Sequence, residues 1–165
     1  MDTLTSRGEK IILEKLNSAG YEALFAGGCV RDAVMQKLNM TVPAPGDIDV
    51  TTNALPEETK RVFDEYKVIE TGIKHGTVTV VLPEGNVEIT TYRSDGSYSD
   101  SRHPDKVRFV TSLEEDLARR DFTINAMACA ADGNIRDPFG GQQDIKDMTI
   151  RAVGCAETRF AEDAL

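Results

Sequence analysis

The sequence is poor in the residues that build cofactor cages, disulfide frameworks and membrane spans. It has no tryptophan, two histidines and three cysteines among 165 residues. No apolar stretch approaches the ~20 residues of a membrane-spanning helix, so a membrane span is excluded and no membrane partner is expected. The cysteines are odd in number and lack CxxC spacing, which excludes a disulfide framework and a zinc ribbon. Reduced thiols and an N-terminus without a secretory signal predict a cytoplasmic protein.

Positive charge is also scarce. The chain has 19 Lys and Arg against 28 Asp and Glu, a net charge of -9. The deficit is spread evenly, and no basic tail or run is present. A dedicated nucleic-acid-binding domain normally carries a basic face. If this chain acts on a nucleic acid, most contacts must therefore come from residues outside it.

The apolar spacing predicts an α/β (α+β) domain with flanking helices on a mixed or mostly antiparallel sheet. Between Arg93 and Lys106 there is no aliphatic residue, which predicts a mobile surface loop. A final helix, strand and helix are expected after Gly141. The other expected helices cover 6–19, 30–38, 56–65, 112–120 and 122–130, and the expected strands cover 21–26, 47–52, 77–82, 87–92, 107–110 and 134–136.

A glycine pair stands where the first strand turns into a helix. Gly27 and Gly28 would let a large ligand approach the backbone, and the free N–H groups of the helix start favour anionic oxygen. Arg31, in the first helical turn, could add a forked contact to phosphate. The alternative is a plain strand-to-helix turn with a surface pair between Arg31 and Asp32. The dinucleotide fingerprint GxGxxG is absent.

Two carboxylates follow on one predicted strand. Asp47 and Asp49 are two residues apart, so their side chains project from the same face. Like charges so placed repel each other unless a cation lies between them, and Mg²⁺ suits such oxygen ligands. The alternative is a solvated polar strand face. Glu88 could be a third carboxylate if its strand lies beside this one.

A third polar cluster follows an expected helix. Asp121 suits the N-cap of the helix predicted at 122–130, and Asn125 lies one turn later. Arg120 and Asn125 then remain available for a polar ligand, although a cap followed by a core helix explains the same residues. A phosphate-binding turn and a carboxylate pair in one segment predict metal-assisted phosphoryl or nucleotidyl transfer. In that chemistry two metal ions activate an attacking hydroxyl and stabilise the leaving pyrophosphate.

These motifs, in this order, resemble the head domain of the class II tRNA nucleotidyltransferases. That family comprises the CCA-adding enzymes, with the related bacterial poly(A) polymerases, in the polymerase-β-like superfamily. The resemblance implies a nucleotidyltransferase palm over residues 1–153 and the start of a truncated neck domain over 154–165. The motifs that carry it are GGCVRD at 27–32, DID at 47–49, RRDFTINA at 119–126 and DPFGG at 137–141.

The resemblance also implies a role for each motif. Asp47 and Asp49 would be the catalytic residues and would hold two Mg²⁺ ions. Gly27, Gly28 and Arg31 would contact the nucleotide triphosphate. The segment 137–140 would be a hinge, and 93–106 would be the flexible loop linked to the switch from CTP to ATP. Three residues would read the ribose: Arg120, Asp121 and Asn125.

One motif of the family is incomplete here. The base-selecting pattern is EDxxR, and residues 162–165 match its first four positions without the arginine. Asp163 would pair with the edge of the incoming base. The neck, body and tail that hold tRNA are not in this sequence either. The resemblance thus implies a head-domain fragment of a longer enzyme, with most RNA contacts supplied by missing C-terminal domains.

The activity implied is addition of CMP and AMP from CTP and ATP to the tRNA 3′ end, with release of pyrophosphate. The alternatives are a poly(A) polymerase, a specialist that adds only CC or only A, and a nucleotide-binding fragment without turnover. Among the remaining residues, His75 is interpreted as a turn or sheet-edge residue and His103 as part of a solvated loop. Cys29 and Cys129 are interpreted as small packed residues.

Overall fold

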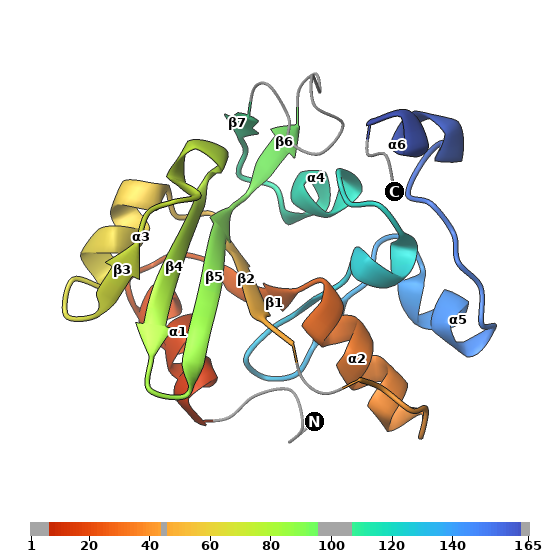
Figure 1. Ribbon diagram of the computed structural model, residues 1–165, viewed down its shortest axis with the longest axis horizontal. Coiled ribbons are helices and arrows are strands. Elements are labelled where there is room, and N and C mark those ends of the chain that lie inside the picture. The colour runs from red at the N-terminus through yellow and green to blue at the C-terminus, as the bar shows by residue number, and fades with distance from the viewer. Residues whose placement is uncertain (1–6, 44–45, 96–106, 163–165) are drawn as a thin grey trace.

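The computed structural model describes residues 7–43, 46–95 and 107–162, which form a sheet flanked by helices (Figure 1). The helices are α1 (Arg7–Ser18), α2 (Gly28–Lys37), α3 (Pro56–Val62), α4 (Leu113–Ala118), α5 (Gly141–Lys146) and α6 (Ala156–Glu162), with 3₁₀ turns η1 (Ile73–His75) and η2 (Thr123–Asn125). The strands are β1 (Ala23–Ala26), β2 (Ile48–Thr52), β3 (Lys67–Ile69), β4 (Thr77–Leu82), β5 (Gly85–Thr91), β6 (Arg93–Asp95), β7 (Val107–Phe109), β8 (Ala128–Cys129) and β9 (Ile135–Arg136).

The main sheet has seven strands in the order β3-β4-β5-β2-β1-β8-β9. Its neighbouring strands are antiparallel except for the parallel pair β2 and β5. The prediction of a mixed, mostly antiparallel sheet is therefore confirmed. Strand β2 lies centrally, with Asp49 opposite Ala26 of β1 and opposite Glu88 of β5.

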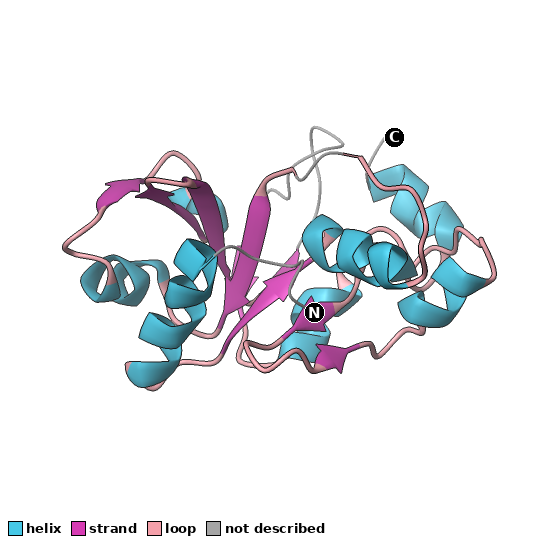
Figure 2. Cartoon of the chain, turned by 90° about the horizontal axis from the view of Figure 1, so that it is seen from below, coloured by secondary structure: helices cyan, strands magenta, loops and turns pink. Residues whose placement is uncertain are grey.

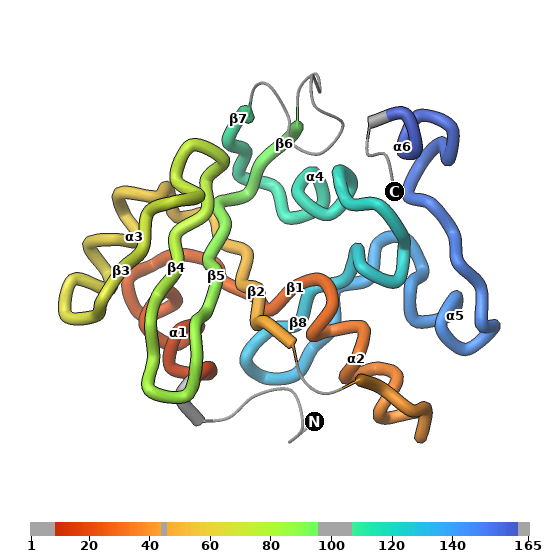
Figure 3. The backbone as a smooth tube through the Cα atoms, in the orientation of Figure 1, coloured from red at the N-terminus to blue at the C-terminus, as the bar shows by residue number. Residues whose placement is uncertain are grey.

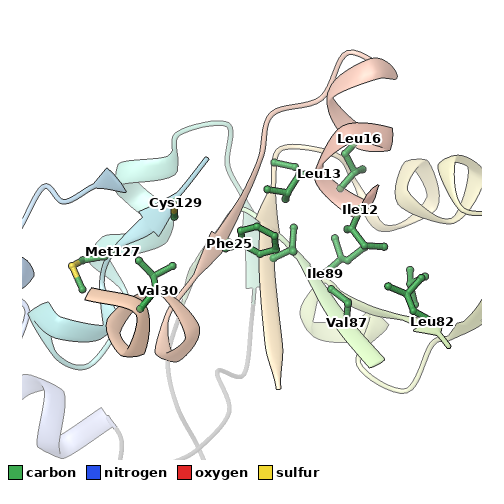
Figure 4. Close-up of a cluster of buried hydrophobic side chains, with 14 of the residues drawn as sticks. Ile12, Leu13, Leu16, Phe25, Val30, Leu82, Val87, Ile89, Met127 and Cys129 are labelled. Carbon is green, nitrogen blue, oxygen red and sulfur yellow. The ribbon is translucent and has the colours of Figure 1, made fainter. Parts of the chain in front are cut away.

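The larger hydrophobic core lies on the sheet face covered by α1, α2 and α3. Apolar residues of α1 recur at helical spacing, and Ile12, Leu13 and Leu16 are fully buried. Figure 4 shows Phe25 between these α1 side chains and a second group that includes Val30 of α2. In the view of Figure 2, helices lie against one side of the strands at the β3–β4–β5 end of the sheet.

A smaller core lies on the opposite face of β1, under α4. Leu24 of β1, Tyr92 and Leu117 of α4 belong to this second cluster. Strand β1 is thus buried on both faces, and α4 lies on the face that does not carry α1. Because Ile48 and Val50 pack toward the larger core, the intervening residues of β2 project toward α4.

The helix predicted at 122–130 is wrong. The segment forms the short turn η2 and then strand β8, which runs beside β1 (Figure 3). Met127 and Cys129 enter the larger core, and Ala126 and Ala128 enter the smaller one. This period of two is that of a strand, but alanine and methionine alone also suit a helix, so the sequence did not separate the two.

The loop predicted from Arg93 is wrong for its first three residues. Residues 93–95 form β6, which pairs with β7, while residues 96–106 lie outside the described part of the chain. The strand predicted between the last two helices is reduced to one bridge between Phe122 and Ala152. Two further short elements, β3 and η1, lie where no helix, strand or loop was predicted. In the described ranges, no helix has the length and apolarity needed to cross a membrane.

Candidate active site

The site is built around the turn between β1 and α2. Gly27 has φ 73° and ψ −135°, a backbone conformation that favours glycine. Its carbonyl accepts from the N–H groups of Val30 and Arg31, so α2 begins at Gly28, two residues earlier than predicted. The N-cap residue, Gly27, has no side chain to cap this helix start. The first N–H groups of α2 have no acceptor within the helix, and N–H groups at a helix start can bind an anion.

Two charged side chains approach Gly27 from other elements. A β-carbon placed on Gly27 would lie 3.0 Å from Nη1 of Arg120 and 3.7 Å from Oδ2 of Asp49. The three sequence motifs therefore meet at this turn, although they are far apart along the chain. A side chain at position 27 would press against the Arg120 guanidinium.

The carboxylates of the DID motif lie at the start of β2. Asp47 immediately precedes the strand and is exposed, and Asp49 is half-buried on the face opposite the core-facing Ile48. Burial raises the pKa of Asp49 to about 6, an increase that Arg120 opposes and that Glu88 and Asp47 reinforce. A buried acid among other acids is the setting that a divalent cation would relieve.

Glu88 joins this group through the sheet register. It lies opposite Asp49 in the parallel pair of β2 and β5 and is exposed, so its strand does lie beside the DID motif. Among the described residues, no cluster of three or more His, Cys, Asp or Glu is close enough to hold a metal. The pair Asp47 and Asp49 nevertheless fits Mg²⁺, which proteins often bind through one or two carboxylates, substrate phosphates and water.

A hydrogen-bonded chain links α2 to η2. Arg31 donates from Nη1 to Oδ1 of Asn125 at 2.9 Å and from Nε to Asp32 at 2.8 Å. Asn125 donates in turn to Oδ1 of Asp121 at 3.2 Å. The structure thus brings Arg31, Asn125 and Asp121 together. Asp121 does not cap an α-helix as predicted, because its carboxylate accepts from the N–H of Phe122 ahead of a 3₁₀ turn.

A pocket of about 230 Å³ lies between α2 and the segment before β2. Gly28, Arg31 and Asp47 line it together with Asp32 and Gln36. Its volume is below the about 300–1,000 Å³ typical of sites for whole ligands. The pocket is therefore smaller than a typical site for a whole ligand, and groups of both charges line it.

Asp116 contacts residues of the site but belongs to none of the sequence motifs. Asp116 of α4 is fully buried and accepts a hydrogen bond from the Thr51 hydroxyl at 2.9 Å. It also lies 3.7 Å from Nη2 of Arg120. The one signal in the sequence is the spacing of four residues between Asp116 and Arg120, which places both on one side of a helical turn.

The remaining candidate residues are structural or lie outside the described ranges. His75 lies in η1, where its carbonyl accepts from the Arg93 guanidinium, so its interpretation as a turn residue is confirmed. Cys29 donates to the carbonyl of Ala26, and burial raises the pKa of its thiol to about 11. Cys129 is buried, as expected. His103 and Asp163 lie outside the described residues.

Comparison with known proteins places these features in a family. A family described as "Poly A polymerase head domain" matches residues 23–151. The chain is 53% identical over 154 residues to a CCA-adding enzyme of Lactobacillus delbrueckii subsp. bulgaricus, and 51% identical to one of Geobacillus thermodenitrificans. These alignments cover 93% of this chain but 37% and 36% of the two relatives. The chain therefore spans little more than a third of the length of these relatives.

Solved structures share the fold. The crystal structure of the Bacillus stearothermophilus CCA-adding enzyme in complex with CTP matches with a TM-score of 0.81 and 46% identity, covering 96% of this chain and 36% of that one. A tRNA nucleotidyltransferase complexed with a primer tRNA and an incoming ATP analog matches with a TM-score of 0.65 and 29% identity, covering 93% of this chain and 41% of that one. The predicted nucleotidyltransferase fold, with its mixed sheet and flanking helices, is confirmed.

Proposed function

The chain belongs to the family of poly(A) polymerase head domains, and from this membership we propose that it is the catalytic head of a CCA-adding tRNA nucleotidyltransferase. The observation that carries the proposal is the meeting of Gly27, Asp49 and Arg120 at one turn. The names of the relatives favour addition of CMP and AMP to tRNA. The substrates are CTP, ATP and the tRNA 3′ end.

The reaction forms one phosphodiester bond and breaks one phosphoanhydride bond. The terminal 3′-hydroxyl of tRNA attacks the α-phosphorus of CTP or ATP, loses its proton, and pyrophosphate leaves. Asp47 and Asp49 would hold two Mg²⁺ ions. Ions held there would supply Lewis-acid chemistry, by lowering the pKa of the attacking hydroxyl and offsetting the negative charge of the pyrophosphate.

The protein groups position the nucleotide. The Gly27–Gly28 turn and the guanidinium of Arg31 bind the triphosphate beside the carboxylates. The backbone donors are the N–H groups at the start of α2, because the N–H of Gly27 itself donates to the carbonyl of Met127. Asp121 and Asn125, which are hydrogen-bonded to each other, contact the ribose together with Arg120. Glu88 would be the third carboxylate of the site, which its register with Asp49 supports.

The regions beyond the site complete the proposal. Residues 1–153 form the head, and residues 154–165 begin the neck, with α6 as its described part. Asp163 would pair with the edge of the incoming base. With a net charge of -9, this chain is poorly suited to bind tRNA phosphates. We expect most tRNA contacts to come from regions that correspond to the parts of the relatives outside the alignment.

The test is incorporation of labelled CMP and AMP into tRNA without its CCA end, using the protein at its native length. We expect Mg²⁺-dependent transfer, and a loss of about 10³-fold or more in Asp47→Asn with Asp49→Asn, because both ligands are lost. Asp64→Asn, at an exposed position after α3, is the matched control and should retain activity. Retained activity in the double variant would overturn the mechanism.

Poly(A) synthesis is a second activity to test, since the family that matches this chain is described as "Poly A polymerase head domain". A tRNA that ends at the discriminator base separates the possibilities when the product is sequenced. The proposal predicts CCA. A run of adenylates would identify a poly(A) polymerase, and CC or A alone would identify a specialist.

A further inference from the structure

The buried carboxylate of Asp116 is tied to the elements that carry the proposed site. The side chain has no exposed surface. Oδ2 accepts from the Thr51 hydroxyl at 2.9 Å, and Oδ1 accepts from the N–H of Arg93 at 3.1 Å and from Nε of Arg119 at 3.2 Å. Arg120 Nη2 lies 3.7 Å from Oδ2. A buried charge requires such partners, because desolvation without them costs several kcal/mol, as an order-of-magnitude estimate.

Two of these partners, Thr51 and Arg120, lie near Asp49 of the DID motif. Thr51 is the second residue after Asp49 on β2 and projects from the same face. Arg120 reaches the same place from the other side, because its Nη1 lies beside Gly27, where Asp49 Oδ2 is also near. Asp116 therefore contacts both the strand that bears Asp49, through Thr51, and the Arg120 guanidinium that lies near Asp49.

Within the described ranges, Arg120 is ion-paired with one of the two acids near it, Asp116. The Arg120 side chain is only 16% exposed, and within the described ranges its guanidinium forms no ion pair with Asp49. Nε of Arg120 is buried without a hydrogen-bond partner in those same ranges. Without Asp116, the guanidinium would be left unpaired close to Asp49, and a direct pair between them would occupy the oxygens that a metal ion needs.

We propose that Asp116 is a positioning residue that holds Arg120 back from Asp49, so that the Asp49 carboxylate stays available for a divalent cation. This inference rests on the proposed function, since it assigns the metal to Asp47 and Asp49. It adds a residue that contacts neither metal nor nucleotide. Asp116 acts through Arg120, whose charge then remains beside the Gly27 turn.

A double-mutant cycle tests the proposal in the protein at its native length. Asp116→Asn keeps the shape and removes the charge, and Arg120→Met keeps much of the stem and removes the guanidinium. The measurements are the affinity for Mn²⁺ alone, from the free-ion signal in electron paramagnetic resonance, and the KM for Mg²⁺–CTP. Residues in contact reveal coupling as non-additive effects.

The expected result is a loss of Mn²⁺ affinity of about tenfold in Asp116→Asn, equivalent to about 1.4 kcal/mol. In the Arg120→Met background, Asp116→Asn should change Mn²⁺ affinity by less than about twofold, because no guanidinium is left to block Asp49. Equal losses in both backgrounds would overturn the proposal, and so would unchanged Mn²⁺ affinity in folded Asp116→Asn.

Asp144→Asn is the matched structural control. Asp144 is another buried carboxylate held by a threonine hydroxyl, from Thr123 at 2.6 Å, and by Nε of Arg151 at 3.2 Å. This variant should lose stability and keep Mn²⁺ affinity. An equal loss of Mn²⁺ affinity in Asp144→Asn would show that the effect is general destabilisation and would also overturn the proposal.

A second variant keeps the test usable if Asp116→Asn does not fold. Asp116→Glu keeps the charge that pairs with Arg120 and should hold Mn²⁺ affinity within about threefold even if stability falls. A loss of about tenfold there would contradict the proposal. Failure of the proposed function is a different result, namely no nucleotide transfer by the wild-type protein, and it can be told apart from these outcomes.

Discussion

At the scale of single residues, Asp49 is partly buried near two other carboxylates, Glu88 and Asp47. This environment makes its ionised form unfavourable for folding and suits it to bind a cation. Its pKa is raised to about 6, first by burial and then by Glu88 and Asp47, against the opposing effect of Arg120. Residues with such shifts often occur at functional sites, where local stability is lower than it could be. The neighbouring Gly27 is likewise specialised, through its positive φ and the nearby Arg120.

Asp49→Asn should stabilise the protein near pH 7 in the absence of divalent ions. Because the folded-state pKa is raised from 3.8 to about 6, the wild-type contribution to stability is complete below about pH 3.8 and is lost as pH rises through about 6. Asparagine does not ionise and avoids this loss. Urea unfolding of both proteins between about pH 4 and pH 7 should show the variant gaining up to about 3 kcal/mol. Parallel pH profiles for the two proteins would contradict this assignment.

Gly27→Ala should impair nucleotide binding as well as folding. Both Gly27 (φ 73°) and Gly20 (φ 91°) have backbones that alanine adopts with strain, but only at Gly27 would the new methyl group meet Arg120. Gly20→Ala, with open space around it, is therefore the matched control. Each variant should lose about 1 kcal/mol of unfolding free energy or more. Only Gly27→Ala should also weaken Mg²⁺–CTP binding in isothermal titration. Equal binding by the two variants would place Gly27 outside the site.

At the scale of elements, the sequence predicted most helices and strands but failed where one segment faces two cores. The helix over α1 follows from apolar residues at a spacing of three and four, and the β4–β5 hairpin follows from alternation. The side chains of the segment that contains β8 alternate between the two cores. Most of these residues are small and also suit a helix, so the composition of the segment favours a helix while its periodicity favours a strand. Tertiary pairing with β1 decided the outcome.

The site could be predicted as a set of motifs but not as a geometry. That the carboxylates of Asp47 and Asp49 share one side is a prediction from their two-residue spacing, and the structure places Asp47 just before β2 and Asp49 on it. The parallel pairing that places Glu88 beside Asp49 depends on strand order, which no local pattern encodes. The role of Asp116 was missed for the same reason, because its partners Thr51 and Arg93 are distant in sequence.

Arg159 of helix α6 is hydrogen-bonded to the segment that carries Arg120, which gives a prediction at this scale. Arg159 donates to the carbonyls of Ala118, Arg119 and Val153, so its guanidinium caps the end of α4 just before Arg120. Arg159→Ala should lower the unfolding free energy by about 1.5–3 kcal/mol, because charged hydrogen bonds are lost. Arg61→Ala, at an exposed position in α3, is the control and should change it little. Unchanged thermal unfolding in Arg159→Ala would show that α6 is not held in this way.

At the scale of the whole molecule, two properties limit tRNA binding by this chain alone: its negative charge and the small share of its relatives' length that it covers. Its net charge is -9, and it spans little more than a third of the length of the relatives that it matches. Nucleotide chemistry is concentrated at the Gly27 turn, whereas tRNA binding requires a positive surface. We therefore expect the two properties to separate experimentally.

The 165-residue chain should bind Mg²⁺–NTP weakly, with little preference among the four bases, and should bind tRNA poorly. Isothermal titration with each nucleotide and a gel-shift assay with tRNA provide the measurements. Weak and uniform nucleotide binding is expected because the proposed base-selecting motif lacks its arginine in this sequence. Clear selectivity for CTP or ATP would show that base reading does not need that arginine.

The most direct test of the central claim is a crystal structure of the protein with Mn²⁺ and CTP, with the metal located by anomalous scattering. The account predicts an anomalous peak at coordination distance, about 2.0–2.3 Å, from carboxylate oxygens of both Asp47 and Asp49. It also predicts the triphosphate against the Gly27–Gly28 turn. A metal peak away from these two carboxylates, or a triphosphate bound elsewhere, would contradict it.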